Sequence, residues 1–120
     1  MQDLIKAYSL FINEAKTQGM TFEEFAKARL EGATRISEAA KAKGGSALLT
    51  YQHFNVKLPY YKKASIGKFN NIELNTELSK LVKALSQGIS SKIKLEQVEF
   101  QRLVGKIEVI GELLIRYKDK

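Results

Sequence analysis

Apolar residues recur every three or four positions along most of this sequence, which is the spacing of amphipathic α-helices. Residues 2–17 show the pattern first, and Gly19 follows as a helix stop. The pattern resumes over residues 22–43, where Thr21 stands three residues before Glu24 and can form a capping box with it. The spacing therefore predicts two helices in the first third of the chain.

The middle of the chain predicts two more helices with a loop between them. Ser46 is a suitable N-cap for a helix over residues 47–56. This helix should end before the single proline of the chain, because the residue preceding a proline avoids the helical region. Residues 59–71 lack the periodicity and are predicted to form a basic loop. The pattern returns over residues 72–87 and stops at Gly88.

The last thirty residues support two interpretations. Spacings of three and four residues define an apolar seam, which predicts one helix over residues 90–118. The members of the seam are Phe100, Leu103, Ile107, Ile110, Leu114 and Tyr117. The competing interpretation is a β-hairpin, because residues 106–110 are rich in β-branched side chains and lie between two glycines. If the segment is helical, its seam serves either as bundle core or as a homodimer interface through residues 100–117.

These elements are predicted to form a single helical domain over residues 1–120. The expected fold class is all-α, a small helical bundle or an orthogonal helical array of four to five helices, with the C-terminal β-hairpin as the alternative for the last segment. No apolar stretch approaches the roughly 20 residues needed to span a bilayer, so no membrane association is expected. The N-terminal residues lack the features of a secretory signal, and we therefore expect a cytoplasmic protein.

The net charge of +7 comes almost entirely from one part of the chain. Residues 41–70 hold six lysines and no acidic residue, within an acid-free segment that covers residues 39–72. Five of the eleven aromatic residues also fall there. Lysines interleaved with aromatic rings suit a surface that neutralises phosphates and stacks on bases. The alternative is that the lysines are ordinary solvated surface and the aromatic residues pack in the core.

Overlapping the start of the acid-free segment, residues 36–57 have the layout of a helix-turn-helix. Ala40 stands four residues before Gly44, where a small side chain lets two helices approach and glycine permits the turn. Residues 34–57 resemble the DNA-binding part of tetracycline-repressor-type regulators. The shared pattern consists of Gly44, Ser46, Tyr51, His53, Phe54 and Lys57.

The resemblance implies that the second helix enters the major groove of DNA. In the family, the counterparts of Tyr51, His53 and Lys57 contact backbone phosphates. The candidate nucleic-acid contacts, from this helix and from the lysines that follow it, are Ser46, Thr50, Tyr51, His53, Lys57, Lys62, Lys63 and Lys68. The alternative for His53 is an interior histidine bonded to a carbonyl group, and Tyr51 can equally pack the helix onto the core.

Two functions of different classes therefore fit the sequence. The first is a DNA-binding protein, or one that binds another polyanion, through the helix-turn-helix-like segment. The second is a helical oligomeric interaction or structural protein with no role on nucleic acids. Binding to duplex DNA over a salt series distinguishes the two, because phosphate contacts weaken as salt rises.

Catalysis and metal binding have little support in the sequence. There is no cysteine and only one histidine, which excludes thiolate zinc sites, cysteine nucleophiles and sites with two histidines. The glycine-rich and nucleophile-elbow motifs of nucleotide-binding proteins and hydrolases are absent. The carboxylate pairs Glu73/Glu77 and Glu108/Glu112 are each one helical turn apart, and we expect both on solvent-facing surfaces. No enzyme activity, cofactor or metal is predicted.

Overall fold

The computed structural model describes residues 19–90 and 96–118, and this part of the chain is helical without any β-strand. Its five helices are α2 (Phe22–Lys43), α3 (Ala47–Asn55), α4 (Leu58–Ser65), α5 (Asn71–Ser90) and α6 (Gln97–Lys118). The predicted all-α class is therefore confirmed. The helix predicted over residues 2–17 lies outside the described residues.

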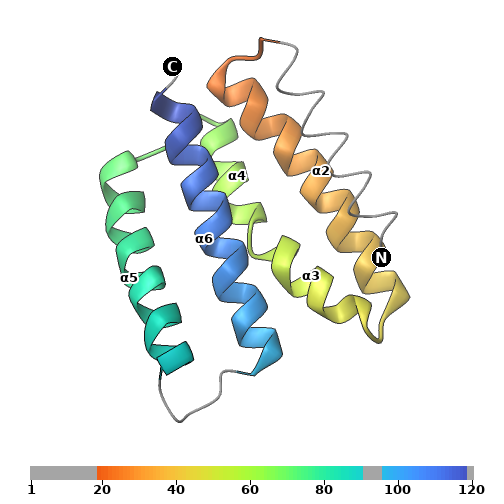
Figure 1. Ribbon diagram of the computed structural model, residues 1–120. Coiled ribbons are helices and arrows are strands. Elements are labelled where there is room, and N and C mark those ends of the chain that lie inside the picture. The colour runs from red at the N-terminus through yellow and green to blue at the C-terminus, as the bar shows by residue number, and fades with distance from the viewer. Residues whose placement is uncertain (1–18, 91–95, 119–120) are drawn as a thin grey trace.

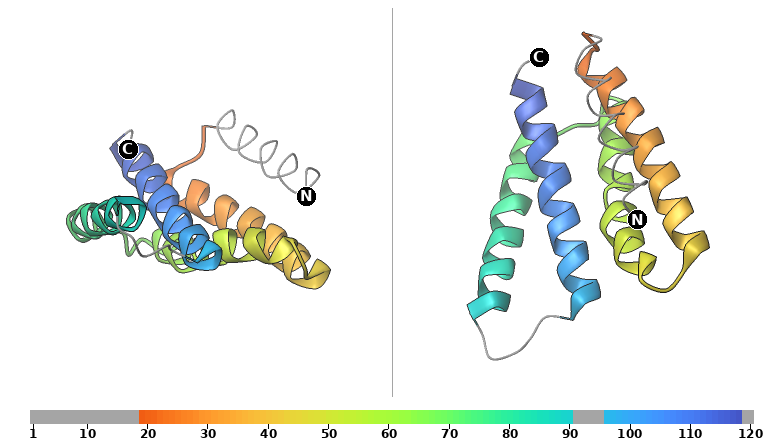
Figure 2. Two further views of the ribbon diagram at one scale, coloured as in Figure 1. Left: turned by 60° about the horizontal axis from the view of Figure 1, so that its bottom comes forward. Right: turned by 45° about the vertical axis from the view of Figure 1, so that its right-hand side comes forward.

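The helices form two antiparallel hairpins that pack on each other (Figures 1 and 2). In the first hairpin, α3 and α4 follow one another back along α2, which packs against both. In the second hairpin, α5 packs against α6. Helix α6 joins the two, because it also packs against α3 and, over a smaller area, against α4 and α2.

In the first hairpin, helix α2 begins and ends where the sequence predicts. The Thr21 hydroxyl accepts a hydrogen bond from the amide of Glu24 at 3.2 Å, which caps the first turn. At the other end, Gly44 has a positive φ of 63° and donates its amide to the carbonyl of Ala40. This left-handed conformation suits glycine and turns the chain into α3.

Helix α4 corrects the prediction of a loop over residues 59–71. Pro59 lies in the first turn of α4, where an amide donor is not required, so the proline starts a helix instead of preventing one. The chain bends only at the two residues Val56 and Lys57, and the amide of Tyr61 bonds to the carbonyl of Lys57. The loop is confined to residues 66–70.

Helix α5 is held mainly through one side. The Asn70 side chain caps it by accepting hydrogen bonds at 3.1 Å from the amides of Ile72 and Glu73. Leu74, Leu78 and Leu81 are partly buried and pack against the core cluster. No side chain of α5 among those described is fully buried, so this helix contributes less to the core than α2 or α6.

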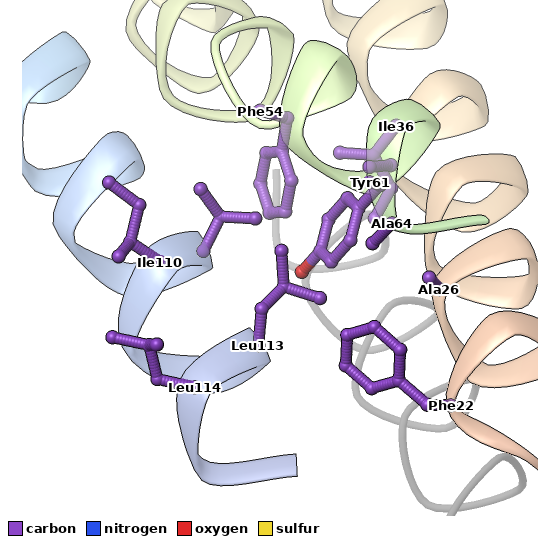
Figure 3. Packing of buried hydrophobic residues seen from close by; sticks show 11 residues of the cluster. Phe22, Ala26, Ile36, Phe54, Tyr61, Ala64, Ile110, Leu113 and Leu114 are labelled. Atoms are coloured by element: carbon purple, nitrogen blue, oxygen red, sulfur yellow. The ribbon is translucent and has the colours of Figure 1, made fainter. Parts of the chain in front are cut away.

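The core lies where α6 meets the first hairpin. Figure 3 shows Leu113 of α6 pointing between Phe22, Phe54 and Tyr61, which come from three other helices. Phe22 also makes edge-to-face contacts with Phe69 and with Tyr117.

Helix α6 resolves the two interpretations of the C-terminal segment. Residues 106–110 lie inside this helix, so the β-hairpin interpretation is wrong and the helical one is confirmed over residues 97–118. Helix α5 extends to Ser90, and residues 91–95 lie outside the described part. Ile110 and Leu114 of the predicted apolar seam are buried, which assigns part of that seam to the core of the bundle.

Candidate functional site

The helix-turn-helix-like segment does contain a tight glycine turn between two helices. Gly44 and Gly45 both have positive φ, and the amides of Ala47 and Leu48 bond back to their carbonyl groups at 3.1 Å. Ser46 occupies the N-cap position of α3, but its side chain makes no capping hydrogen bond. The turn therefore forms from the two glycines, and the Ser46 hydroxyl stays at an exposed position.

Helix α3 is enclosed on two sides. It packs against α2 on one side and against α6 on another, and its Ala47 and Phe54 side chains are buried. Helix α6 approaches α3 closely at Gly105, where an added Cβ would lie 2.3 Å from the carbonyl oxygen of His53. The part of α3 that remains open to solvent is its N-terminal half, where Leu48 is exposed.

His53 and Lys57 face α6, away from the outer surface. His53 Nε2 lies 2.7 Å from a carboxylate oxygen of Glu108, and Lys57 Nζ donates to the same oxygen at 3.1 Å. Lys57 is only 4% exposed, and its ammonium group also lies 4.9 Å from the centre of the Phe54 ring. Two of the three side chains expected on phosphates therefore tie α3 and the start of α4 to α6 in this structure.

The electrostatics of this cluster follow from its geometry. The hydrogen bond from His53, followed by the positive charge of Lys57, lowers the pKa of the Glu108 carboxyl from 4.5 to about 2, against the opposing effect of partial burial. Glu108 therefore stays ionised over the ordinary pH range. A buried lysine is tolerated here because it is paired with this carboxylate.

A second carboxylate one turn along α6 has a matching role. Glu112 accepts hydrogen bonds from the buried Arg29 of α2 and from the Tyr61 hydroxyl of α4, the latter at 2.5 Å. Arg29 is 2% exposed. The expectation of a solvent-facing pair is therefore wrong for Glu112, which is partly buried, whereas Glu108 is exposed as expected and also pairs with His53 and Lys57. Both are partners of basic side chains from the first hairpin.

Three of the predicted lysines do lie together on the surface. Lys62 and Lys63 are exposed in the last turn of α4, and the exposed Lys68 follows at the turn. The amide of Lys68 bonds to the carbonyl of Lys63 at 2.9 Å, which keeps these two residues adjacent. We call Lys62, Lys63, Lys68 and the nearby Lys106 the lysine corner.

Lys106 belongs to this group because it lines the same shallow depression as Lys63. The depression lies between α4, α5 and α6, and its lining also includes Tyr60 and Glu77. An adjoining depression is lined by Lys63 and Lys68. Lys106 was not a sequence candidate, because it lies 38 or more residues beyond the other lysines of the corner and only the packing of α6 brings it near.

Two acidic side chains of α5, Glu73 and Glu77, also line the depression that holds Lys63 and Lys68, and Glu77 is already engaged. Glu77 accepts a hydrogen bond from the Tyr60 hydroxyl, a contact that ties α5 to α4. Burial, reinforced by this hydrogen bond and by the charge of Glu77, raises the pKa of the Tyr60 hydroxyl well above its usual value of 10.0. Tyr60 therefore remains a protonated hydrogen-bond donor.

The remaining sequence candidates lie at the other end of the α3–α4 run (Figure 1). Ser46 is exposed, Thr50 is partly buried, and the Tyr51 ring is also partly buried and lies 6.0 Å from the Lys41 ammonium group. The eight predicted contacts thus divide into an N-terminal group on α3, the pair at Glu108, and the lysines at the end of α4.

Comparisons with protein-family models, with curated proteins and with solved structures find no match to this chain. Among the described residues, no group of three or more histidine and carboxylate side chains is placed to hold a metal ion. None of the described helices combines the length and the apolar character that crossing a bilayer requires.

Proposed function

We propose that the protein binds a polyanion through the lysine corner, and that duplex DNA is its ligand. The observation that carries this proposal is the exposure of Lys62, Lys63 and Lys68 as neighbours at the end of α4, inside a segment of the sequence without acidic residues. Lys106 extends the same basic surface onto α6. The proposal assigns the chain a binding role in the cytoplasm and no catalytic step.

The chemistry of the corner favours phosphate recognition without base reading. Lysine is a compact charge that pairs with phosphate oxygens and carries little sequence information. Four lysines that each neutralise one phosphate would give a slope of about −3.6 for log K against log salt. We therefore expect moderate affinity at low salt, with a weak dependence on DNA sequence.

Only the N-terminal part of the tetracycline-repressor-like segment is available for contact with DNA in this proposal. Its exposed residues are Ser46 and, from α2, Lys41 and Lys43, and the partly buried Thr50 and Tyr51 lie beside them on α3. A contact of this portion with DNA would support a second, separate patch.

For His53 and Lys57 we propose a structural role in place of the phosphate contact implied by the family resemblance, because Glu108 already pairs with both. Their replacement should then affect stability more than DNA binding.

The experiment is a titration of a fluorescein-labelled DNA duplex, followed by fluorescence anisotropy at low salt. Replacing Lys62, Lys63 and Lys68 together by Gln should weaken binding by at least about tenfold, because about three counterion-releasing contacts are lost. The matched control replaces Lys27, Lys80 and Lys83, which are exposed lysines of α2 and α5, and so removes the same total charge. Equal weakening by both triple variants, or no binding by the wild type, would refute the proposal.

Self-association is a second candidate function with its own supporting observation. Within residues 100–117 of α6, the apolar side chains Phe100, Ile115 and Tyr117 remain exposed in the single chain. Burying such side chains against another molecule is favourable. A homodimer would also present two lysine corners to one polyanion.

A further inference from the structure

Helix α6 carries an apolar stripe on the side that points away from the core. Successive spacings of four, three, four and four residues place its members on one face of the helix. The stripe consists of Phe100, Val104, Ile107, Gly111 and Ile115. It shares Phe100 and Ile107 with the seam predicted from the sequence, but it omits the seam residues Ile110 and Leu114, which are buried inside the bundle.

The two ends of the stripe are open to solvent, whereas Val104, Ile107 and Gly111 between them are partly buried. Ile115 is 69% exposed and Phe100 is 38% exposed. An added Cβ at Gly111 would meet no described atom within 4 Å. Figures 1 and 2 show α6 between α5 on one side and the first hairpin on the other. Phe100 and Ile115 therefore leave apolar surface exposed at both ends of this face.

We propose that the stripe is the contact surface of a homodimer, in which the α6 helices of two copies lie antiparallel across a two-fold axis. This inference rests on the self-association proposed above and specifies its surface. In this register Phe100 of one copy faces Ile115 of the other, and Val104 faces Gly111. Gly111 has no side chain, so the two backbones can approach closely at that point.

The charges at the ends of α6 favour the antiparallel arrangement. Exposed Glu96 lies just before the N-terminal end of the helix, and exposed Lys118 lies at its C-terminal end. An antiparallel pair brings each glutamate near the lysine of the other copy, and it also opposes the two helix dipoles. A parallel pair would place like charges together, which is unfavourable.

The size of the surface predicts a weak dimer. A helix of 22 residues is about 33 Å long at 1.5 Å per residue. A single helical face of this length is smaller than the roughly 800 Å² per partner of a standard stable interface. We therefore expect a reversible monomer–dimer equilibrium in the range of about 10–500 μM.

Sedimentation equilibrium of the full chain, at protein concentrations across that range, tests the proposal. Ile115→Asn should raise the dimer dissociation constant at least about 30-fold, because two buried copies of Ile115 are lost from each dimer. The matched control is Ile72→Asn, which removes an isoleucine that is 75% exposed on α5, outside the stripe. This control should change the dissociation constant less than about twofold, as expected for an unrelated surface position.

A charge exchange tests the antiparallel register. Lys118→Glu should weaken the dimer, and adding Glu96→Lys to it should restore the affinity, because the exchanged pair is again complementary.

Three results would overturn the proposal: a wild-type monomer at every concentration, equal effects of the two isoleucine variants, or loss of thermal stability by Ile115→Asn in a monomeric sample. The last result would mean that another part of the same chain, such as residues 1–18, covers the stripe.

Titrating DNA into Ile115→Asn at low protein concentration separates this proposal from polyanion binding. If the DNA affinity of each lysine corner is unchanged in this variant, the proposed DNA binding stands even if the dimer is disproved.

Discussion

Two glycines in α6, only six positions apart, should respond in opposite ways to the same substitution. An added Cβ at Gly105 would lie 2.3 Å from the His53 carbonyl oxygen and 2.7 Å from a Val56 methyl group, so α3 would have to move. At Gly111 the added methyl would enter open space. The two variants share the same change in composition, so they are controls for each other.

The magnitudes follow from two opposing effects. Alanine in place of glycine inside a helix stabilises it by about 1 kcal/mol, and this is the whole effect expected for Gly111→Ala. Overpacking costs about 1–3 kcal/mol, and the upper end applies at Gly105 because a backbone carbonyl cannot rotate away. Gly105→Ala should therefore lower the free energy of unfolding by about 2 kcal/mol, so that the two variants differ by about 3 kcal/mol.

Thermal denaturation followed by circular dichroism, at a protein concentration of a few micromolar, measures both changes. The midpoint temperature should rise by about 4 °C for Gly111→Ala and fall by about 8 °C for Gly105→Ala. A neutral or stabilising Gly105→Ala would show that α3 and α6 are not in contact at this point. It would therefore refute the packing described for the two hairpins.

Three further predictions concern the polar contacts. Glu108→Gln should reduce the loss of folding stability that occurs as the pH falls from about 4.5 to about 2. The pKa of Glu108 is lower in the folded state than in the unfolded state. Ionised Glu108 therefore stabilises the fold above the unfolded-state pKa, and this stabilisation disappears when the carboxylate is protonated. Thermal melts over this pH range measure the difference, and parallel pH curves for wild type and variant would count against the His53–Lys57–Glu108 cluster. Glu112→Leu should destabilise the fold by about 3 kcal/mol, because buried Arg29 and the Tyr61 hydroxyl both lose their acceptor; an unchanged urea midpoint would exclude this pairing. Asn70→Ala should cost about 1 kcal/mol through loss of the α5 cap, with Asn75→Ala as a control inside the helix, and equal effects of the two would contradict the capping role.

The sequence predicted most helices because each has a periodic apolar face and a recognisable end. Thr21 and Gly44 mark the limits of α2 as expected. The pattern does not predict α4 because a proline ends the preceding helix, although a proline in the first turn is also compatible with a new helix. Local spacing alone could not distinguish a proline that ends one helix from a proline that begins the next.

The candidate site was less predictable because it depends on contacts between distant segments. Lys57 and Glu108 are 51 residues apart in the sequence, and only the packing of α6 against α3 makes them partners. The same packing withdraws His53 from solvent and brings Lys106 near Lys63. The distribution of charge along the sequence identifies the basic segment. Only the structure shows that Lys57 is buried whereas Lys62, Lys63 and Lys68 are exposed.

The salt dependence of DNA binding tests the central claim most directly. The slope of log K against log salt should be less steep by about 2.7 in the variant that carries Lys62→Gln, Lys63→Gln and Lys68→Gln than in the wild type, because each lost phosphate contact removes about 0.9. The control variant at Lys27, Lys80 and Lys83 should keep the wild-type slope. Identical slopes for the wild type and the lysine-corner variant would contradict the assignment of these lysines to a polyanion.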